Sequence, residues 1–401
     1  RQQNMFGRSL DDSFAPEIKR NVSAVVIARL VANACYRFAP PFLAIIAKSF
    51  DVSLSQIGVA IFVSELTGFA SPFLGRVVDR LSHRNAMVLG LLGTGIGCTI
   101  AAAAPNVVVF AIGVTFLGLT KQAFDLGLGA WIADFVPYNQ RGKVVGITEM
   151  GWALGLLVGV SLMGIVTSLT NWRIGYAFGV AAVIGCVVVL ISRINNEPRK
   201  NHIPNAGEHT RIQGRNWLVL VTMFCIMCSV QNLFVTFGAW LEDDFGFGAA
   251  RLAVVGFSFG VVELVASTTS AQYTDKVGKE RSILGGALLT VPAGIAMAIG
   301  SSNLVVGVVA AAVFFLGFEF AVVSLLPIAS QLVPNSPGTG LGWVLGAGTL
   351  GRALMAVIAT RGYEQYGMPA PALIGAGFGL LGAIAIYIYR SLGGAPTVQP
   401  R

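Results

Sequence analysis

The chain alternates between long apolar runs and short polar breaks. Twelve runs are long enough to cross a bilayer, for which a helix needs about 20 apolar residues. We predict membrane-spanning helices over residues 22–46, 54–75, 86–104, 107–133, 144–168, 174–192, 216–240, 252–272, 282–301, 303–331, 339–360 and 371–389. The breaks carry turn signals such as the Pro105-Asn106 pair. The pattern therefore predicts an all-α integral membrane protein.

Composition agrees with this prediction. The 401 residues are 55% hydrophobic and only 11% charged, whereas soluble domains carry about 25% charged residues. The longest polar stretch, 195–215, contains no apolar run. We predict that it is a cytoplasmic linker between an amino-terminal six-helix half, 22–194, and a carboxyl-terminal six-helix half, 216–390.

The distribution of Lys and Arg predicts the orientation. With the amino terminus in the cytoplasm, 19 of the 27 Lys and Arg residues fall in cytoplasmic segments and four in outside loops. This bias obeys the positive-inside rule and predicts that both termini are cytoplasmic. The net charge of +8 is thereby explained without nucleic acid. We expect a multi-pass monomer in the plasma (inner) membrane, with the lipid bilayer as its environment.

Motifs for enzymatic chemistry are missing from the sequence. All five cysteines fall inside predicted helices, so a disulfide framework is excluded, and Cys225-x-x-Cys228 is interpreted as packing. The three histidines lie in loops without metal-ligand spacing. Neither a phosphate-binding loop nor HExxH is present. We expect no enzyme activity, no cofactor and no metal.

Two loops indicate an internal repeat. GRVVDRLSHR (75–84) follows the second predicted helix, and AQYTDKVGKE (271–280) follows the eighth. Both place an Asp, a basic residue, a small residue and another basic residue in the same order. The same residue pattern at the same place in two halves of the chain indicates that the halves arose by duplication. The alternative is two independent basic loops.

On these residues the chain resembles the major facilitator superfamily. Gly75, Asp79, Arg80 and Arg84 match its signature between helices 2 and 3, and Asp275 and Lys276 match the degenerate copy between helices 8 and 9. Asp134 at the end of helix 4 and Arg141 in the next loop are similar too. The resemblance implies two pseudo-symmetric six-helix halves and alternating-access transport, in the efflux-type branch of the family.

The resemblance also implies gating roles for these eight residues. Asp79 would be stabilised at the start of helix 11, near Gly338-Thr339-Gly340, where unpaired amides and the positive end of the helix dipole lie. Arg84 would pair with Asp134. Two family features are replaced, however. Lys121 and Asp125 stand where helix 4 usually has an arginine, and the stretch GWALGLLVGVSLMG (151–164) in helix 5 has glycines but no proline.

Nine charged side chains lie inside the predicted helices, where each costs about 3 kcal/mol or more. They are Arg29, Arg37, Glu65, Lys121, Asp125, Glu149, Glu263, Glu319 and Arg352. All nine are on helices that line the cavity in the similar family. Depth along the helices, at about 1.5 Å per residue, predicts two clusters. One joins Arg29, Asp125 and Glu149, and the other joins Arg37, Lys121 and Glu65. The alternative is that these groups only neutralise one another.

These charges give the candidate sites. We predict substrate binding by Arg37, Lys121, Glu65, Arg352, Gln231 and Asn232. We predict proton coupling by Asp125, Glu149, Arg29, Glu263 and Glu319, because a carboxyl group can take up a proton where arginine stays charged. An anionic head could lie at Arg37 and Lys121, with an apolar body against phenylalanines of the second half, although such phenylalanines can simply be packing.

The expected function is secondary active transport of a small organic, anionic or amphiphilic molecule, in proton-coupled export. An importer or uniporter of a small nutrient is the alternative within transport. A channel-like pore is a different class, which the mixed signs of the interior charges disfavour.

Overall fold

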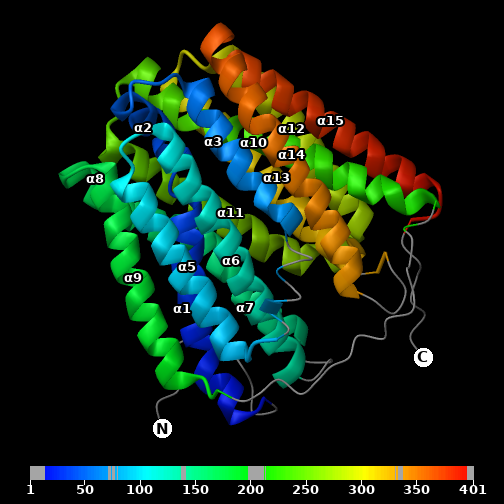
Figure 1. The fold of residues 1–401 in the computed structure, drawn as a ribbon. Helices are drawn as coiled ribbons and strands as arrows, with labels where there is room; N and C mark the ends of the chain where they lie inside the picture. Colours follow the sequence, from blue (N-terminus) through cyan, green and yellow to red (C-terminus); the bar gives the residue numbers. More distant parts are fainter. Residues whose placement is uncertain are drawn as a thin grey trace. The chain divides into compact units, whose positions relative to one another are not determined.

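The protein is helical throughout the residues that the computed structural model describes, which are 14–70, 74, 77–78, 80–136, 141–196, 212, 214–329, 331–332 and 337–394. Eleven helical stretches are long and apolar enough to cross a membrane, and the expected second span is a shorter apolar stretch, Leu54–Ala70. Each of the twelve expected spans corresponds to a helical stretch (Figure 1). The all-α membrane fold is therefore confirmed.

Residues with local capping chemistry set several helix ends. The side chain of Asn106 accepts a hydrogen bond from the backbone N–H of Val109 at 3.0 Å, which confirms the break expected at Pro105-Asn106. Ser82 caps the helix that begins at His83 in the same way, because its side-chain oxygen accepts a hydrogen bond from the backbone N–H of Asn85 at 3.2 Å. Gly246 ends another helix with φ of 64°, a left-handed conformation that glycine adopts without strain.

The chain forms two compact units. Unit 1 comprises Arg1–Ser53, Thr67–Pro204 and Phe247–Val261. Its elements are α1 (Pro16–Arg37), η2 (Pro40–Phe42), α2 (Leu43–Ser49), η3 (Thr67–Ala70), α5 (His83–Ala103), α6 (Val107–Phe135), α7 (Arg141–Leu154), η5 (Gly155–Val160), α8 (Ser161–Leu169), α9 (Trp172–Arg193) and the first part of α11 (Ala249–Val277). Within it α1 packs against α6, α7, α9 and η5, and α5 packs against α6 and α9.

Unit 2 comprises Leu54–Leu66, Asn205–Gly246 and Val262–Arg401. Its elements are α3 (Leu54–Leu66), η6 (Gly214–Asn216), α10 (Trp217–Phe245), the rest of α11, α12 (Lys279–Gly300), α13 (Leu304–Ala329), α14 (Pro337–Tyr366) and α15 (Pro369–Ser391). Within it α3 packs against α14, α10 packs against α13, α14 and α15, and α12 packs against α13 and α15.

The two units differ from the predicted sequence halves in one reciprocal exchange. Leu54–Leu66, from the first half, belongs to unit 2, and Phe247–Val261, from the second half, belongs to unit 1. These segments are the first parts of helices that occupy equivalent positions in the repeat. The exchange is therefore symmetrical, as duplication predicts.

Two helices are interrupted where the sequence has unusual residues. The first span breaks at Pro40–Phe42, a 3₁₀ turn between α1 and α2, because a proline lacks the N–H that continues an α-helix. The fifth span contains a π-helical stretch, Gly155–Val160. Pro292 and Pro327 lie inside α12 and α13.

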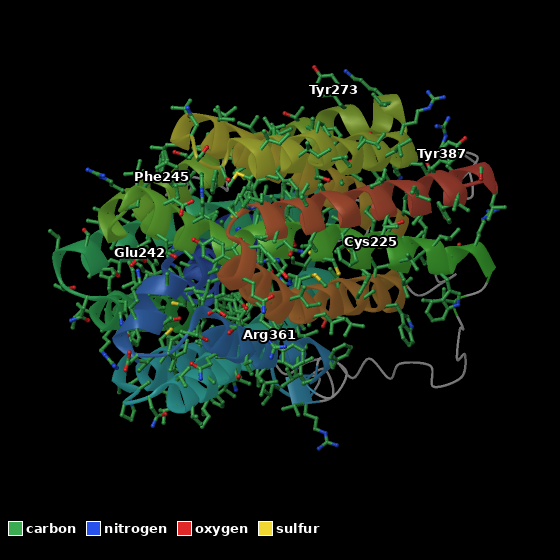
Figure 2. All side chains as sticks on the ribbon, turned by 90° about the horizontal axis from the view of Figure 1, so that it is seen from above. Cys225, Glu242, Phe245, Tyr273, Arg361 and Tyr387 are labelled. Carbon is green, nitrogen blue, oxygen red and sulfur yellow. The ribbon has the colours of Figure 1, made fainter. Side chains whose placement is uncertain are left out.

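Apolar side chains cover much of the outside of each unit. In unit 2 Tyr273 and Tyr387 point away from the helices, while Cys225 lies among them (Figure 2). All five cysteines are buried and free, in agreement with the sequence prediction. Many exposed residues are large and apolar, such as Leu169 and Ile299. An apolar exterior of this kind suits contact with lipid.

Candidate functional site

A row of glycines brings α1 close to the fifth span in unit 1. Gly151, Gly155 and Gly159 recur every fourth residue, so they lie on one face. A Cβ at Gly155 would lie 2.8 Å from the Cβ of Asn33, and one at Gly159 would collide with Ala34. Only glycine allows this approach. As a result Asn33 Nδ2 donates to the carbonyl oxygen of Gly151 at 3.1 Å.

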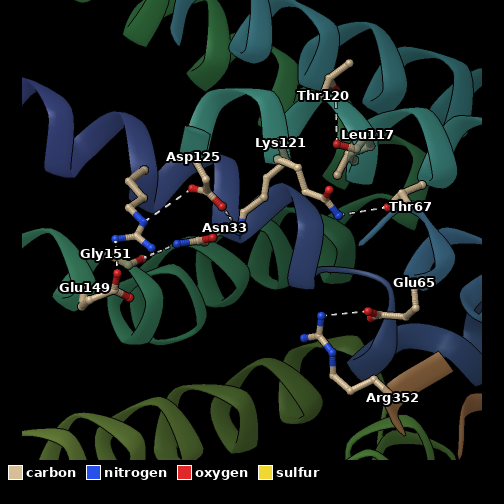
Figure 3. A network of polar contacts seen from close by, with 12 residues as sticks. Asn33, Glu65, Thr67, Leu117, Thr120, Lys121, Asp125, Glu149, Gly151 and Arg352 are labelled. Carbon is tan, nitrogen blue, oxygen red and sulfur yellow. Dashed lines mark hydrogen bonds and ion pairs between the residues drawn. The ribbon is translucent and has the colours of Figure 1, made fainter. Parts of the chain in front are cut away.

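Arg29 holds two carboxylates, one turn away from Asn33 on α1. Its Nη1 donates to Glu149 Oε1 at 2.8 Å, and its Nε lies 3.6 Å from Asp125 Oδ1 (Figure 3). Asp125 also contacts Lys121, with Nζ to Oδ2 at 2.6 Å. The cluster of Arg29, Asp125 and Glu149 expected from depth is therefore present. Asp125 connects it to Lys121, so a charge change at Asp125 affects both cations.

Arg37 and Lys121 meet at the indole of Trp152. The guanidinium carbon of Arg37 lies 4.5 Å from the ring centroid and Lys121 Nζ lies 5.3 Å from it. Arg37 Nη1 also donates to the backbone oxygen of Trp152 at 3.1 Å, and Lys121 Nζ is 5.4 Å from the ring of Tyr36. Both cations are buried, while Trp152 and Tyr36 are partly exposed. The two cations predicted to hold an anion thus share one aromatic residue.

The interior charges of unit 1 do not cancel. Of the nine charges predicted inside the spans, unit 1 contains three cations, Arg29, Arg37 and Lys121, and the carboxylates of Asp125 and Glu149. Glu149 is also the most solvent-exposed member, with 48% of its side chain accessible. The interior therefore has a surplus of one positive charge when all five groups are ionised.

Glu65, which depth groups with Arg37 and Lys121, has a cation partner within its own unit. It belongs to unit 2, where its Oε2 lies 2.8 Å from Nη2 of Arg352 (Figure 3). The same two helices meet at Gly58, where a Cβ would lie 3.0 Å from the carbonyl oxygen of Ala356. Helix depth predicts only the level of a carboxylate, whereas the rotation of its helix about its axis decides which cation it meets.

The α3–α14 contact has a third link. Glu364 Oε1 accepts a hydrogen bond from the backbone N–H of Ser55 at 2.8 Å, at the start of α3. A carboxylate there satisfies an amide that has no partner within the helix and also faces the positive end of the helix dipole. Ser55 with Glu364 and Glu65 with Arg352 therefore join the two antiparallel helices at both ends of α3.

The other predicted residues of unit 2 are all buried. Gln231 and Asn232 lie on α10, and Asn232 Nδ2 donates to the backbone oxygen of Cys228 at 2.8 Å. Glu263 on α11 and Glu319 on α13 are 2% and 6% exposed, so both carboxyl groups are shielded from solvent. Ser267 Oγ donates to Glu319 Oε1 at 2.7 Å.

Three of the phenylalanines considered for an apolar pocket pack on one another. Phe234, Phe237 and Phe315 have ring centroids 6.4 Å apart in each pair. Phe237 and Phe315 are also almost fully buried. This arrangement favours the packing interpretation for these three residues.

The predicted gating residues are only partly described. Gly75 and Asp79 lie outside the described residues, as do the side chains of Arg141 and Asp275. Arg80 and Lys276 are exposed. Asp134, which the family signature pairs with Arg84, contacts His83, with Nε2 2.7 Å from Oδ2. His83 begins α5, and its ring also lies edge-on to Phe135 at 5.3 Å.

Sequence reasoning missed Asn33, Tyr36 and Trp152. One signal was available, since Arg29, Asn33 and Arg37 recur every fourth residue along an apolar helix and so form a polar stripe. In the described part of the chain no group of three or more His, Cys, Asp and Glu residues could hold a metal ion.

Comparisons with known proteins agree with this architecture. The chain is 28% identical over 377 residues to the uncharacterized MFS-type transporter YwfA of Bacillus subtilis (strain 168), covering 88% of each chain. It is 24% identical over 302 residues to the multidrug resistance protein MdtG of Dickeya zeae (strain Ech586), covering 70% of this chain and 72% of the relative.

Solved structures share the fold at low sequence identity. A bacterial homolog of the human lysosomal transporter Spinster, in an inward-facing and occupied conformation, matches with a TM-score of 0.78 at 13% identity, over 94% of this chain and 97% of the other. The human organic anion transporter MFSD10 matches with a TM-score of 0.71 at 17% identity, over 93% and 100%. The profile of the Major Facilitator Superfamily matches residues 25–356 and 219–401. The chain is a multi-pass membrane transporter that belongs to this superfamily.

Proposed function

We propose that the protein exports small organic anions, including anionic amphiphiles, across the plasma membrane in exchange for protons. Arg37 and Lys121 hold the anionic group at Trp152. The observation that carries this proposal is the meeting of two buried cations at one partly exposed indole, in a unit whose interior charges sum to plus one. In a poorly hydrated interior such a surplus attracts an anion strongly.

Transport follows alternating access between the halves 22–194 and 216–390, with 195–215 as their linker. The loop residues Asp79, Arg80 and Arg84, with Asp275 and Lys276 in the repeat, form the cytoplasmic gate. Within unit 2, Gln231, Asn232, Glu65 and Arg352 also bind substrate in this proposal. The burial of Gln231, Asn232 and Glu65 supports the assignment, and the side chain of Arg352 is 21% exposed.

Export is favoured over import by relatives that carry multidrug resistance in their names. Besides MdtG, multidrug resistance protein 2 of Bacillus subtilis (strain 168) is 21% identical over 341 residues. An organic anion as substrate is also consistent with the organic anion transporter MFSD10, although that likeness by itself shows only the fold.

Proton coupling is supported by the carboxylates around Arg29. Asp125 and Glu149 both contact this one guanidinium. When Glu149 binds a proton, Arg29 keeps Asp125 as its partner. When Asp125 binds a proton, Arg29 keeps Glu149, and Lys121 loses its carboxylate partner. A proton at either residue therefore changes the contacts of these cations, which would couple proton binding to transport.

A matched pair of probes tests the proposal. Naphthalene-1-sulfonate and 1-naphthylmethylammonium share one aromatic ring system and differ in the sign of their charge. We expect the sulfonate to raise the thermal unfolding temperature of the purified protein and the ammonium to leave it unchanged. In proteoliposomes, an imposed pH gradient should then drive accumulation of the sulfonate. Equal stabilisation by both probes would contradict the anion site, and accumulation that is independent of pH would indicate uniport.

A further inference from the structure

A seam of polar side chains joins α11 to α13 inside unit 2. At one end Ser267 donates to the carboxylate of Glu319. Further along, the hydroxyl oxygens of Ser270, Thr274 and Ser324 form a triangle with sides of 3.0, 2.9 and 2.8 Å. These three hydroxyl groups belong to residues that are 0%, 6% and 1% exposed, so the seam lies in the interior.

The seam leads from buried carboxyl groups towards one end of the helices. Glu263, Ser267, Ser270 and Thr274 are spaced by four, three and four residues along α11, which places them on one face. Thr274 is three residues from the end of α11 at Val277. The distribution of Lys and Arg predicts that this end is cytoplasmic. The seam thus connects the interior carboxyl groups to the predicted cytoplasmic surface.

Hydroxyl groups suit such a path because each both donates and accepts hydrogen bonds. Side chains that merely hold two membrane helices together can also be Ser or Thr. Two features go beyond simple packing here. The three hydroxyl groups are bonded to one another in a closed triangle, and the neighbouring hydroxyl of Ser267 is bonded to a carboxylate.

Other ionisable groups near the seam are few and mostly lie at helix ends. The helices packed against α13 are α10, α12 and α14. The interior group of α14 is Arg352, which is paired with Glu65 of α3. The remaining groups on these helices and on α11 are Cys225, Cys228, Glu242, Asp243, Asp244, Arg251, Glu263, Tyr273, Asp275, Lys276, Lys279, Glu280, Arg281, Arg361, Tyr363, Glu364 and Tyr366. Unit 2 thus has three interior carboxyl groups, Glu65, Glu263 and Glu319, for one interior cation.

We propose that the α11–α13 seam conducts protons between Glu319 and the predicted cytoplasmic end of unit 2. This inference rests on the proton coupling proposed above and names its route. Thr274 accepts a proton and passes its own to Ser324, which passes its own to Ser270. One water molecule bridges the gap between Ser270 and Ser267, which are about 5–6 Å apart at Cβ. Ser267 then protonates the Glu319 carboxylate, and rotation of each hydroxyl restores the chain.

The first test needs no substrate. Infrared spectra of the protein in lipid, recorded against pH, should contain a protonated-carboxyl band that disappears in Glu319→Gln. Exchange of this proton for deuterium should be roughly tenfold slower in Thr274→Val and Ser324→Ala, because each removes one hydrogen-bonded link. Ser324→Thr keeps a hydroxyl and should exchange normally. Thr268→Val is the matched control, since Thr268 is exposed on the same helix and its hydroxyl donates to backbone oxygens of that helix, at Leu264 and Val265.

The second test uses transport of naphthalene-1-sulfonate, whose charge does not change with pH. Thr274→Val and Ser324→Ala should keep exchange of the probe down its own gradient and lose accumulation driven by a pH gradient. The absence of a titrating Glu319 band, or unchanged deuterium exchange in both variants, would overturn the seam as a proton path. If the Glu319 band is present and both variants exchange slowly, but the wild type shows no pH-driven accumulation, the proposed function alone would be contradicted.

Discussion

The ammonium group of Lys121 lies 2.6 Å from the carboxylate of Asp125, one turn further along α6. This contact alone would make Lys121 half of a neutral buried pair. Asp125 is shared with Arg29, however, and Lys121 also lies over the rings of Trp152 and Tyr36. One carboxylate therefore serves two cations, and Lys121 retains part of its attraction for another anion.

The close packing of α1 against the fifth span gives a direct stability prediction. A Cβ at Gly159 would overlap Ala34, whereas a Cβ at Gly185 on α9 meets nothing within 4 Å. We expect Gly159→Ala to destabilise the protein by about 1–3 kcal/mol through overpacking. Gly185→Ala should be neutral or stabilising by about 0.5–1 kcal/mol. Thermal unfolding of both variants checks this, and equal effects would contradict the packing of α1 against η5.

The pair of Glu65 and Arg352 gives a second prediction. Removing one partner leaves the other charge buried, which typically costs about 3–5 kcal/mol. We expect Glu65→Gln and Arg352→Gln each to lower the unfolding temperature clearly. The double replacement Glu65→Leu with Arg352→Met should restore most of the loss. Single variants as stable as the wild type would show that the two side chains are not paired in the folded protein.

The fold was predictable because apolar runs of spanning length and basic loops are local properties of the sequence. The partners of the interior charges were predictable only in part. Arg29 met Asp125 and Glu149 as expected, because all three lie at one depth on helices of one unit. The pairing of Glu65 with Arg352 was not predicted, since a carboxylate at a given depth can face different neighbours as its helix rotates.

The same physical limit explains two other differences. The contact of His83 with Asp134 was not predicted, because neighbouring residues on a helix point about 100° apart and the sequence does not give the rotation of the helix. The hydroxyl triangle of Ser270, Thr274 and Ser324 requires two helices to face each other in one register. The spacing along α11 hinted at a polar face, but only the structure supplies Ser324 from α13.

A double-mutant cycle tests the His83–Asp134 contact. We expect His83→Ala and Asp134→Asn to show a coupling free energy of about 1 kcal/mol, as is usual for a hydrogen-bonded pair. The cycle of Arg84→Ala with Asp134→Asn should give a smaller value. Chemical or thermal unfolding of the purified variants supplies both numbers. Stronger coupling through Arg84 would favour the pairing that the family signature implies.

Neutralising the carboxyl groups around Arg29 tests coupling. Asp125→Asn and Glu149→Gln each remove the negative charge of one carboxylate that contacts Arg29. We expect at least one of them to abolish accumulation of naphthalene-1-sulfonate driven by a pH gradient, while exchange of the probe down its own gradient continues. Both activities are measurable in the same proteoliposomes. Full accumulation in both variants would remove these two residues from the proton pathway.

Binding should depend on Lys121 in a graded way. We expect Lys121→Ala to weaken binding of naphthalene-1-sulfonate more than it weakens the fold. Lys121→Arg should retain part of the affinity, because arginine keeps the positive charge at a slightly different position. Isothermal titration together with thermal unfolding separates the two effects. A loss of stability that fully accounts for the loss of binding would assign Lys121 a structural role.

The central claim is that Lys121 and Arg37 recognise an anion, and the double replacement Lys121→Met with Asp125→Leu tests it most directly. Removing both partners of a buried ion pair often leaves stability intact or improves it. The measurement is binding of naphthalene-1-sulfonate to this variant, compared with Asp125→Asn alone, at matched thermal stability. We predict that the double variant is stable and does not bind the sulfonate, whereas Asp125→Asn still binds it. A stable double variant that binds the sulfonate as the wild type does would contradict the account.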